Sequence, residues 1–505
     1  MAVKIFAAID VGSFELELGI YEISGKSGIR QIDRVRHMIP LGKDTYNTGK
    51  ISYSLVDEMC RVLSDFVKIM EGYQADSYRA YATSAMREAK NNQIVLDQIK
   101  VHTGLDVKII SNSEQRLLSY KAIAAKETEF NKLIQKGTAI VDVSFGSMQL
   151  SLFDKDALVS THNLRLGALR MREMISNVQT AEEDRVHILE EIVDNELFTF
   201  RKMYLKDREI KNLIGAGEEI LYLARKTIER GTRSFISADE VVAFYKKLEK
   251  MNLAQIQEEF GVSAEYASLL LPSAMIYKRV MELTGAETFW IPAIRLGDGM
   301  AAEFADEKRL VKFNHDFSGD IIAAARNMAK RYKCHMSHSQ VLERYALDIF
   351  DCMKKYHGLG KRERLLLQIA VNLHSCGKFV SMRDTSECAY NIIMSTEIIG
   401  LSHDEREIIA NTVRYNMEPF LYEASKNNTM LIAKLVAILR LANSMDRSHR
   451  QKLADCRISV RDGELIVSTG YEGDITLERL AFENKVDFFE EIYGIRPVLK
   501  QKRRV

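Results

Sequence analysis

The order of apolar and polar positions is nearly the same at two places in the chain. Residues 6–13 (FAAIDVGS) and residues 139–147 (AIVDVSFGS) each have an apolar run that ends in an aspartate and a turn of small residues. After each turn, apolar residues alternate with polar ones, which is typical of a half-buried strand. The repeat therefore predicts two β-hairpins, each opening one half of an α/β region.

The spacing of the remaining apolar positions predicts further elements that alternate between helix and strand up to about residue 300. The expected helices cover residues 51–72, 92–103, 181–200 and 218–227, and the expected strands cover residues 77–84, 107–110 and 211–217. After about residue 305 strand patterns nearly vanish, and amphipathic helices are expected over residues 339–356, 362–373, 389–399, 403–415 and 430–445. Strand patterns return at residues 457–460 and 464–467, before a basic end at 500–504 that we interpret as solvated.

The fold class expected from this order is α/β followed by mainly α. We expect one α/β lobe over residues 1–125 and a second over 126–303. A helical domain with a small C-terminal α/β segment is expected over 304–505.

The hairpin turns carry the first indication of chemistry. A tight turn leaves backbone N–H groups that can face an anion, and an adjacent aspartate can hold a divalent cation directly or through water. Asp10 and Asp142 end the two apolar runs. If the hairpins face each other, they form a phosphate-and-metal clamp between two lobes, as in actin-like ATPases and sugar kinases.

Composition narrows the class of protein. A chain of 505 residues with 46% hydrophobic residues can build two to four domains, and its net charge of +1 gives no overall attraction to nucleic acid or membrane. The six cysteines are scattered without a CxxC pair, which is typical of reduced cysteines in the cytosol. A strand pattern begins within a few residues of the start, and no apolar run is long enough to span a membrane. We therefore expect a cytoplasmic protein without a membrane or specific nucleic-acid partner.

Several short segments, in this order and spacing, resemble the exopolyphosphatase/guanosine pentaphosphate phosphohydrolase family over nearly the whole chain. They are 8–13 (AIDVGS), 82–89 (ATSAMREA), 110–115 (ISNSEQ), 140–142 (IVD), 213–217 (LIGAG), 356–359 (YHGL), 373–374 (LH) and 439–449 (LRLANSMDRSH). The resemblance implies two actin-like (ribonuclease H-like) lobes and a helical domain related to HD phosphohydrolases. It also implies removal of terminal phosphate from polyphosphate or a guanosine alarmone, usually with Mg²⁺, and it is compatible with a homodimer.

The resemblance also implies roles for particular residues. Asp10 and Asp142 are expected on the metal side of the site, with Asp142 at the family's metal position. Arg87 matches the phosphate-binding arginine, and a guanidinium fork suits phosphate oxygens. The other expected phosphate-binding residues are Ser13, Gly146, Ser147, Gly215 and Gly217.

The second turn departs from the family pattern Asp-Ile-Gly-Gly-Gly-Ser-Thr-Glu. Ser144 and Phe145 replace two glycines, and Gln149 replaces the closing acid. A side chain at Phe145 makes a positive φ costly and obstructs the close approach of phosphate. In the first turn, Phe14-Glu15 replaces a usual Asn-Ser, and in the third loop Glu218-Glu219 replaces Gly-Thr.

The catalytic position also differs. Gln115 stands where the family has its presumed base, the second glutamate of a Glu-Glu-Ala-Arg motif. An amide hydrogen-bonds water but cannot accept its proton at neutral pH. The neighbouring Glu114 is the alternative catalytic candidate.

The helical half departs from an HD metal site, which needs two histidines and two aspartates. His338 and His374 are retained, whereas Ser375 and Asn443 stand at the expected aspartate positions. Neutral imidazoles without carboxylates bind a hard metal poorly. We therefore expect the helical domain to be structural or a binding platform.

Three hypotheses follow. The first is an exopolyphosphatase-type hydrolase with weak activity, and the second is a non-catalytic relative that senses polyphosphate, a nucleotide or an alarmone. The third is a scaffold that has lost both properties. Asp10, Asp142 and Arg87 favour ligand binding, whereas Gln115 and the changes in the second turn disfavour catalysis. The helical half disfavours an actin-like ATPase or a sugar kinase.

Overall fold

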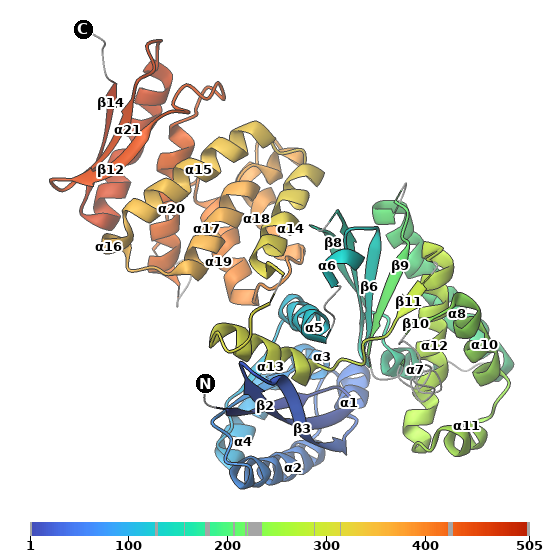
Figure 1. The fold of residues 1–505 in the computed structure, drawn as a ribbon. Helices are drawn as coiled ribbons and strands as arrows, with labels where there is room; N and C mark the ends of the chain where they lie inside the picture. Colours follow the sequence, from blue (N-terminus) through green and yellow to red (C-terminus); the bar gives the residue numbers. More distant parts are fainter. Residues whose placement is uncertain are drawn as a thin grey trace. The chain divides into compact units, whose positions relative to one another are not determined.

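The computed structural model of the chain divides into two compact units, residues 1–320 and 321–505 (Figure 1). It describes residues 3–126, 130–155, 157–176, 182–205, 208–217, 220, 235–286, 288–313, 315–422 and 428–501. The helix expected over residues 218–227 lies outside the described residues apart from Ile220. Each unit is described by itself below.

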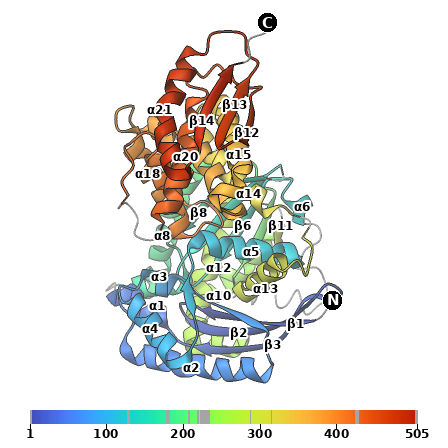
Figure 2. The ribbon, with the colours of Figure 1, turned by 90° about the vertical axis from the view of Figure 1, so that its left-hand side faces the viewer.

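The first unit begins with a five-stranded sheet of order β3-β2-β1-β4-β5. Its strands are β1 (Lys4–Val11), β2 (Glu15–Ser24), β3 (Gly28–Met38), β4 (Ser77–Ala82) and β5 (Val107–Ile109). Helices α2 (Tyr53–Gly72) and α4 (Asn92–Thr103) lie on one side of this sheet, and α5 (Asn112–Lys126) and α13 (Leu296–Glu307) lie on the other (Figures 1 and 2).

The second sheet repeats this arrangement. Its order is β10-β11-β9-β6-β7-β8. The strands are β6 (Thr138–Val143), β7 (Met148–Asp154), β8 (Ala157–Leu164), β9 (Asn212–Ala216), β10 (Phe235–Ile236) and β11 (Thr288–Trp290). In both sheets the first three strands in sequence are antiparallel neighbours. Strands β4 and β5 then continue parallel to β1, and β9 and β11 continue parallel to β6, with β10 antiparallel at the edge of the second sheet. The two α/β lobes expected from the sequence repeat are therefore confirmed, with Asp10 and Asp142 at equivalent places.

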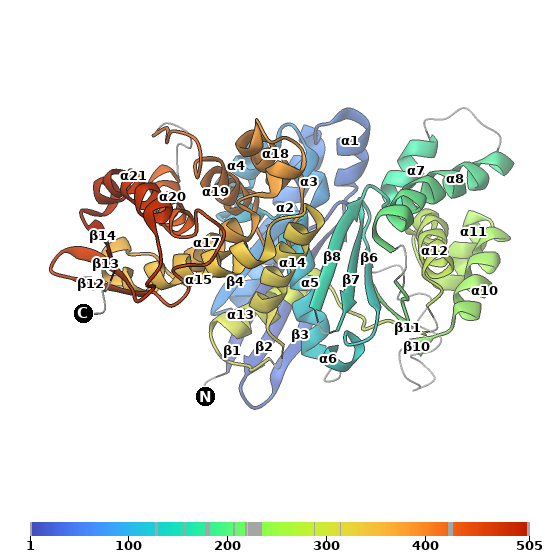
Figure 3. The same ribbon diagram turned by 90° about the horizontal axis from the view of Figure 1, so that it is seen from above.

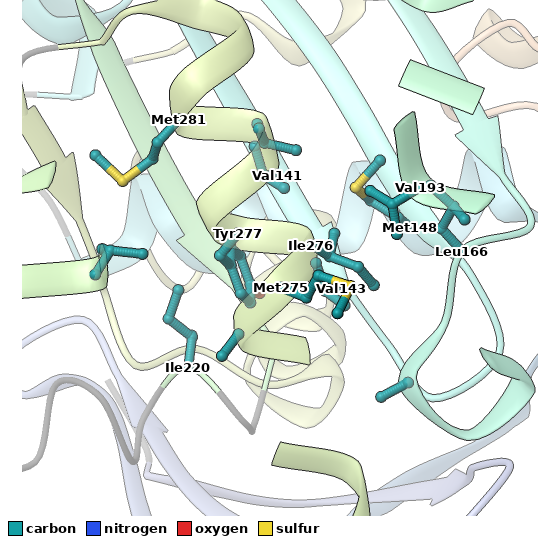
Figure 4. Close-up of a cluster of buried hydrophobic side chains, with 14 of the residues drawn as sticks. Val141, Val143, Met148, Leu166, Val193, Ile220, Met275, Ile276, Tyr277 and Met281 are labelled. Atoms are coloured by element: carbon teal, nitrogen blue, oxygen red, sulfur yellow. The ribbon is translucent and has the colours of Figure 1, made fainter. Parts of the chain in front are cut away.

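The two faces of the second sheet differ in character. One face packs on α12 (Ala264–Thr284), where Val141 and Val143 meet Ile276 and Tyr277 in a buried apolar cluster (Figure 4). Helix α5 lies on the opposite face (Figure 3). Because successive side chains of a strand point to opposite faces, Asp142 points away from the apolar cluster and toward α5.

Shorter helices complete the first unit around the two sheets. They are α1 (Leu41–Thr48), α3 (Ser84–Glu88), α6 (Phe130–Leu133), α7 (Ala168–Ser176), α8 (Glu182–Phe200) with the π-helical turn η1 (Arg201–Leu205), α10 (Ala238–Glu249) and α11 (Leu253–Phe260). Helix α14 (Phe317–Arg331) runs across the boundary between the units.

The second unit is mainly helical, as expected. Its helices are α15 (Met336–Cys352), α16 (Lys354–His357), α17 (Lys361–Leu373), the 3-10 turn η2 (Cys376–Phe379), α18 (Thr385–Ser395), α19 (His403–Arg414), α20 (Thr429–Ser444) and α21 (Thr476–Tyr493). A small sheet of β12 (Arg457–Arg461), β13 (Glu464–Thr469) and β14 (Arg496–Gln501) ends the unit. Lys500 pairs with Ser468 in this sheet, so the basic end is not simply solvated at its first residues. Within the described ranges, no helix combines the length and apolar character needed to cross a membrane.

Candidate functional site

A cavity of about 100 Å³ lies in the first unit where β1 and β6 end. The first hairpin contributes Asp10 and Ser13 to its wall, and the second contributes Asp142 and Phe145. The two hairpins therefore face each other across one cavity, as the repeat predicted.

The first turn is fastened to the start of α3. The Gly12 amide donates to the Glu15 carbonyl at 3.0 Å, which closes the turn. The Ser13 hydroxyl accepts from the Ala85 amide at 3.1 Å and lies 2.8 Å from the Ser84 hydroxyl. The Ser13 side chain thus has a structural partner, and its backbone amide finds no protein acceptor among the described residues.

The second turn is closed by the Ser144 amide, which donates to the Ser147 carbonyl at 2.9 Å. Ser144, Phe145 and Gly146 all have negative φ, so the expected backbone cost at Phe145 is wrong. The Phe145 ring instead packs on Phe14, with ring centroids 5.0 Å apart. The two aromatic replacements therefore support each other across the lobes, and the Phe145 ring forms part of the cavity wall. Like that of Ser13, the Phe145 amide has no protein acceptor in the part of the chain that the structure describes.

The predicted glycines have three different environments. A Cβ on Gly146 would lie 2.0 Å from the Tyr46 hydroxyl, so the second turn closes directly on the first lobe. Gly217 lines the cavity, whereas Gly215 packs against the Phe289 ring in the core. Ser147 is buried and does not line the cavity.

Gly217 gives a test of this packing. Its φ is +121°, and a Cβ would lie 2.2 Å from the Val143 carbonyl oxygen. We expect Gly217→Ala to lower the free energy of unfolding by about 2–4 kcal/mol in urea titrations, because backbone strain and overlap add. Gly104→Ala is the matched control, since its φ of +73° carries strain and no atom lies within 4 Å of its Cβ. Equal losses in the two variants would show that the approach to Val143 has no energetic weight.

The negative charges of the carboxylates in the cavity wall are partly offset by hydrogen bonds and ion pairs. The Ser119 hydroxyl donates to Asp142 Oδ2 at 2.9 Å, but burial raises the pKa of Asp142. Glu17 also lines the cavity and accepts a hydrogen bond from Arg34 Nε at 2.9 Å. Glu15 lines the cavity too, and its Oε2 forms an ion pair with Arg36 Nη1 at 3.7 Å. Their alternation along β2 and the pairing of Glu17 with Asp10 could have indicated that both face this side of the sheet.

The two candidate bases have different places. Gln115 lines the cavity, and Glu114 does not. The Glu114 carboxylate accepts from the Ser111 amide at 2.8 Å, while the Glu114 amide donates to the Ser111 hydroxyl at 3.1 Å. This is a capping box at the start of α5, which the Ser-x-x-Glu spacing could have revealed. A catalytic role for Glu114 stays a prediction.

The predicted phosphate arginine is held by protein groups. Arg87 Nη1 donates to the Ile110 carbonyl at 2.5 Å, and Nη2 donates to Asn112 Oδ1. Arg87 does not line the cavity, whereas Arg295 does. The sequence contained no motif that would have singled out Arg295.

The second unit brings the two retained histidines, His338 and His374, together with His449, for which the sequence predicted no role. The His338 ring stacks on His449 with centroids 4.0 Å apart and lies 5.2 Å from His374. His338 Nδ1 is 2.7 Å from the buried Asp446 carboxylate, so the expectation of imidazoles without a carboxylate is wrong. Even so, no group of three or more His, Cys, Asp or Glu among the described residues is arranged to hold a metal ion.

Comparison with known proteins decides the family. Residues 20–301 match the model of the Ppx/GppA phosphatase family. The chain belongs to this family. Residues 322–479 of this Ppx/GppA chain match the model of Ppx/GppA phosphatase, domain III. Phosphatases of the family generally use divalent metal ions.

Two relatives are similar to this chain over most of its length. The chain is 21% identical to a guanosine-5'-triphosphate,3'-diphosphate pyrophosphatase of Photobacterium profundum over 479 residues, covering 92% of this chain and 91% of that protein. It is also 21% identical to the protein of the same name from Vibrio atlanticus over 457 residues, covering 87% of this chain and 86% of that protein.

Solved structures show the same fold. An exopolyphosphatase from Cytophaga hutchinsonii superposes with a TM-score of 0.54 at 19% identity, covering 61% of this chain and 99% of that one. The Ppx/GppA family member of Aquifex aeolicus gives a TM-score of 0.51 at 19% identity, covering 62% of this chain and 100% of that one. The actin-like α/β lobes expected from the sequence are thereby confirmed.

Proposed function

We propose that the cavity between the hairpins binds the phosphate chain of polyphosphate or of a phosphorylated guanosine nucleotide. Ser13 and Phe145, on opposite hairpins, carry this proposal, because both residues line the cavity and their backbone amides have no protein acceptor among the described residues. Backbone amides of tight turns that have no protein acceptor can bind an anion. Arg295, on the same wall, adds a guanidinium suited to phosphate oxygens.

We further propose that this cavity hydrolyses terminal phosphate weakly or not at all. Attack by water needs a group that orients it and accepts its proton, and Gln115 on the cavity wall can only hydrogen-bond. A non-catalytic sensor of the same ligand is the second candidate, and the same glutamine favours it. In either case we propose that the protein is cytoplasmic and forms a homodimer. We also propose that its two α/β lobes cover residues 1–125 and 126–303 and that an HD-like helical domain follows over residues 304–505.

The donor set does not fit a tightly held Mg²⁺. Burial raises the pKa of Asp142, so a proton competes with a metal for this carboxylate. Gln149, directly across the strand pair from Asp142, offers a neutral amide in place of a second carboxylate. Asp10 and Asp142 remain the predicted ligands of any cation at this cavity.

Calorimetric titration with long-chain polyphosphate and with guanosine pentaphosphate tests the binding site. We expect Arg295→Ala to weaken binding about 10-fold to 100-fold, because a charge-assisted contact is worth roughly 1.5–3 kcal/mol. Arg87→Ala is expected to have the same effect only if Arg87 leaves its partners at Ile110 and Asn112 to reach the ligand.

Arg61→Ala, on the exposed face of α2, is the matched control and should bind as the wild type does. Equal affinity in all four proteins would remove both Arg87 and Arg295 from the site.

A further inference from the structure

A second cavity lies in the first unit, and we call it the α5–α13 pocket. Its volume is about 320 Å³, against about 100 Å³ for the cavity between the hairpins, and the described residues that line one do not line the other. Strands β2 and β3 contribute Tyr21 and Ile29 to its wall, the end of α5 contributes Lys126, and the start of α13 contributes Asp298. Cavities above about 300 Å³ are large enough to be small-molecule sites.

The α5–α13 pocket lies where the chain passes between the two lobes. Helix α5 comes directly before the second lobe, and α13 is the first helix after the last strand of that lobe. The two helices pack against each other on the first sheet (Figure 2). The Lys126 ammonium donates to the Ala293 carbonyl at 2.6 Å and to Asp298 Oδ2 at 3.1 Å, so it connects the end of α5 with the start of α13. A ligand in this pocket therefore contacts both passages of the chain.

The polar groups of this wall are held in place by one another. The Tyr21 side chain is 1% exposed, and its hydroxyl donates to Asp298 Oδ1 at 3.2 Å. The Arg295 amide donates to Asp298 Oδ2 at 3.0 Å. An ammonium group has three donors, and the bonds to Ala293 and Asp298 leave one donor of Lys126 for a ligand.

The charges of the wall favour a negatively charged ligand. Lys126 and Lys312 line the pocket together with one carboxylate, that of Asp298. His315 also lines it, and its Nε2 lies 2.6 Å from the buried Asp320 carboxylate, which offsets any positive charge on this ring. The lysines therefore leave an excess of positive charge, and a charge-assisted hydrogen bond from an ammonium suits a carboxylate or a phosphate.

The apolar part of the wall favours a ring. Phe130 and Phe313 both line the pocket, and aromatic side chains pack well against other rings, offset or edge to face. Ile29 and Val311 line it as well and pack against a buried apolar cluster of the first lobe. The small side chain of Ala125, at the exposed end of α5, leaves room beside them.

We propose that the α5–α13 pocket binds a small organic anion that carries an aromatic ring. The anionic group would bond to Lys126 and Lys312, and the ring would lie against Phe130 and Phe313. Binding here does not depend on what the cavity between the hairpins holds.

Calorimetric titration of the full chain with 2-naphthoate and with guanosine 5'-monophosphate tests the pocket. Both probes join an aromatic ring to an anionic group, and a preference between them distinguishes an aromatic carboxylate from a nucleotide. We expect at least one of them to bind the wild type with a dissociation constant below about 1 mM, which is modest for ligands of this size. Neutral 2-naphthamide is expected to bind at least about 3-fold more weakly than 2-naphthoate, because it lacks the charge.

Two variants locate the binding. Ala125→Leu is expected to weaken it at least about 10-fold, since the larger side chain occupies the pocket. Ala254→Leu, at an exposed position of α11, is its matched control and should bind as the wild type does. Lys312→Ala is expected to weaken binding about 3-fold to 10-fold, and Lys308→Ala, exposed and outside the wall, should leave it unchanged.

A melting curve establishes that each variant is folded, and Lys312→Ala decides the matter if Ala125→Leu is not, because Lys312 is exposed. A wild type that binds neither anion below about 1 mM would overturn the proposal. So would equal affinity in the wild type and in each folded pocket variant, since the ligand would then bind elsewhere. Tighter binding of 2-naphthamide than of 2-naphthoate would show that the pocket does not select an anion.

Discussion

Gln115→Glu is expected to raise phosphate release from polyphosphate about 10²-fold to 10⁴-fold at neutral pH, the usual contribution of a general base. Gln115 lines the cavity beside Ser119 and Asp142, so a carboxylate there would contact water in the same space. Release of phosphate from long-chain polyphosphate and from guanosine pentaphosphate, both with Mg²⁺, measures the gain. Adding Phe145→Gly and Gln149→Glu should increase it further, because these changes open the turn and restore an acid.

Glu114→Gln is the matched control on the adjacent residue. Its carboxylate caps α5 through the Ser111 amide, so we expect a loss of about 1 kcal/mol in stability and no change in turnover. The opposite pattern would contradict the account: a wild type that turns over at ordinary enzyme rates and loses them in Glu114→Gln would identify Glu114 as the base.

The second unit is expected to lose stability in acid. Burial, followed by the nearby charge of His338, lowers the pKa of His374 to about 3. The unfolded state therefore binds a proton near pH 6.5 that the folded state refuses, and stability falls as the pH drops from about 6.5 toward 3. One pKa unit corresponds to 1.36 kcal/mol, so about 2 kcal/mol should be lost by pH 5. Burial lowers the pKa of His449 as well, which adds in the same direction.

Other charged groups near His374 also affect its pKa. The positive charges of His338, Lys378 and His449 lower the pKa of His374 further. The Asp446 carboxylate lies 2.7 Å from His338 Nδ1. Urea unfolding from pH 7 to pH 4.5, followed by circular dichroism, measures the loss. The single tryptophan, Trp290 in β11, reports the first unit separately.

His374→Asn should flatten the pH dependence, and His403→Asn, at an exposed position of α19, should leave it unchanged. If His374→Asn has the wild-type slope, His374 does not exclude a proton from the folded unit.

The sequence indicated those features that depend on local pattern. The two hairpins could be predicted because buried strands, turn residues and period-two alternation are local, and their repetition fixed the equivalent places of Asp10 and Asp142. Asn92–Thr103 was expected as a helix and is α4 with the same bounds. Helices α17 and α19 differ from expectation by one residue at one end.

Features that depend on distant partners could not be predicted. The engagement of Arg87 with Ile110 and Asn112 depends on how β5 ends beside α3, which no spacing along the chain specifies. The pairing of His338 with Asp446 joins residues 108 positions apart. Arg295 lines the cavity because α13 returns to the first sheet after the whole second lobe, and no motif in the sequence indicates this position.

Hydrogen–deuterium exchange with and without long-chain polyphosphate tests the central claim most directly, because it reports the backbone amides that the account assigns to the phosphate chain. We predict that polyphosphate slows exchange in two separate peptides, one covering the turn at Ser13 and one covering the turn at Phe145. Protection of both turns, together with little or no phosphate release, is the result that the account requires. Unchanged exchange at both turns at saturating polyphosphate, or protection confined to the second unit, would contradict it.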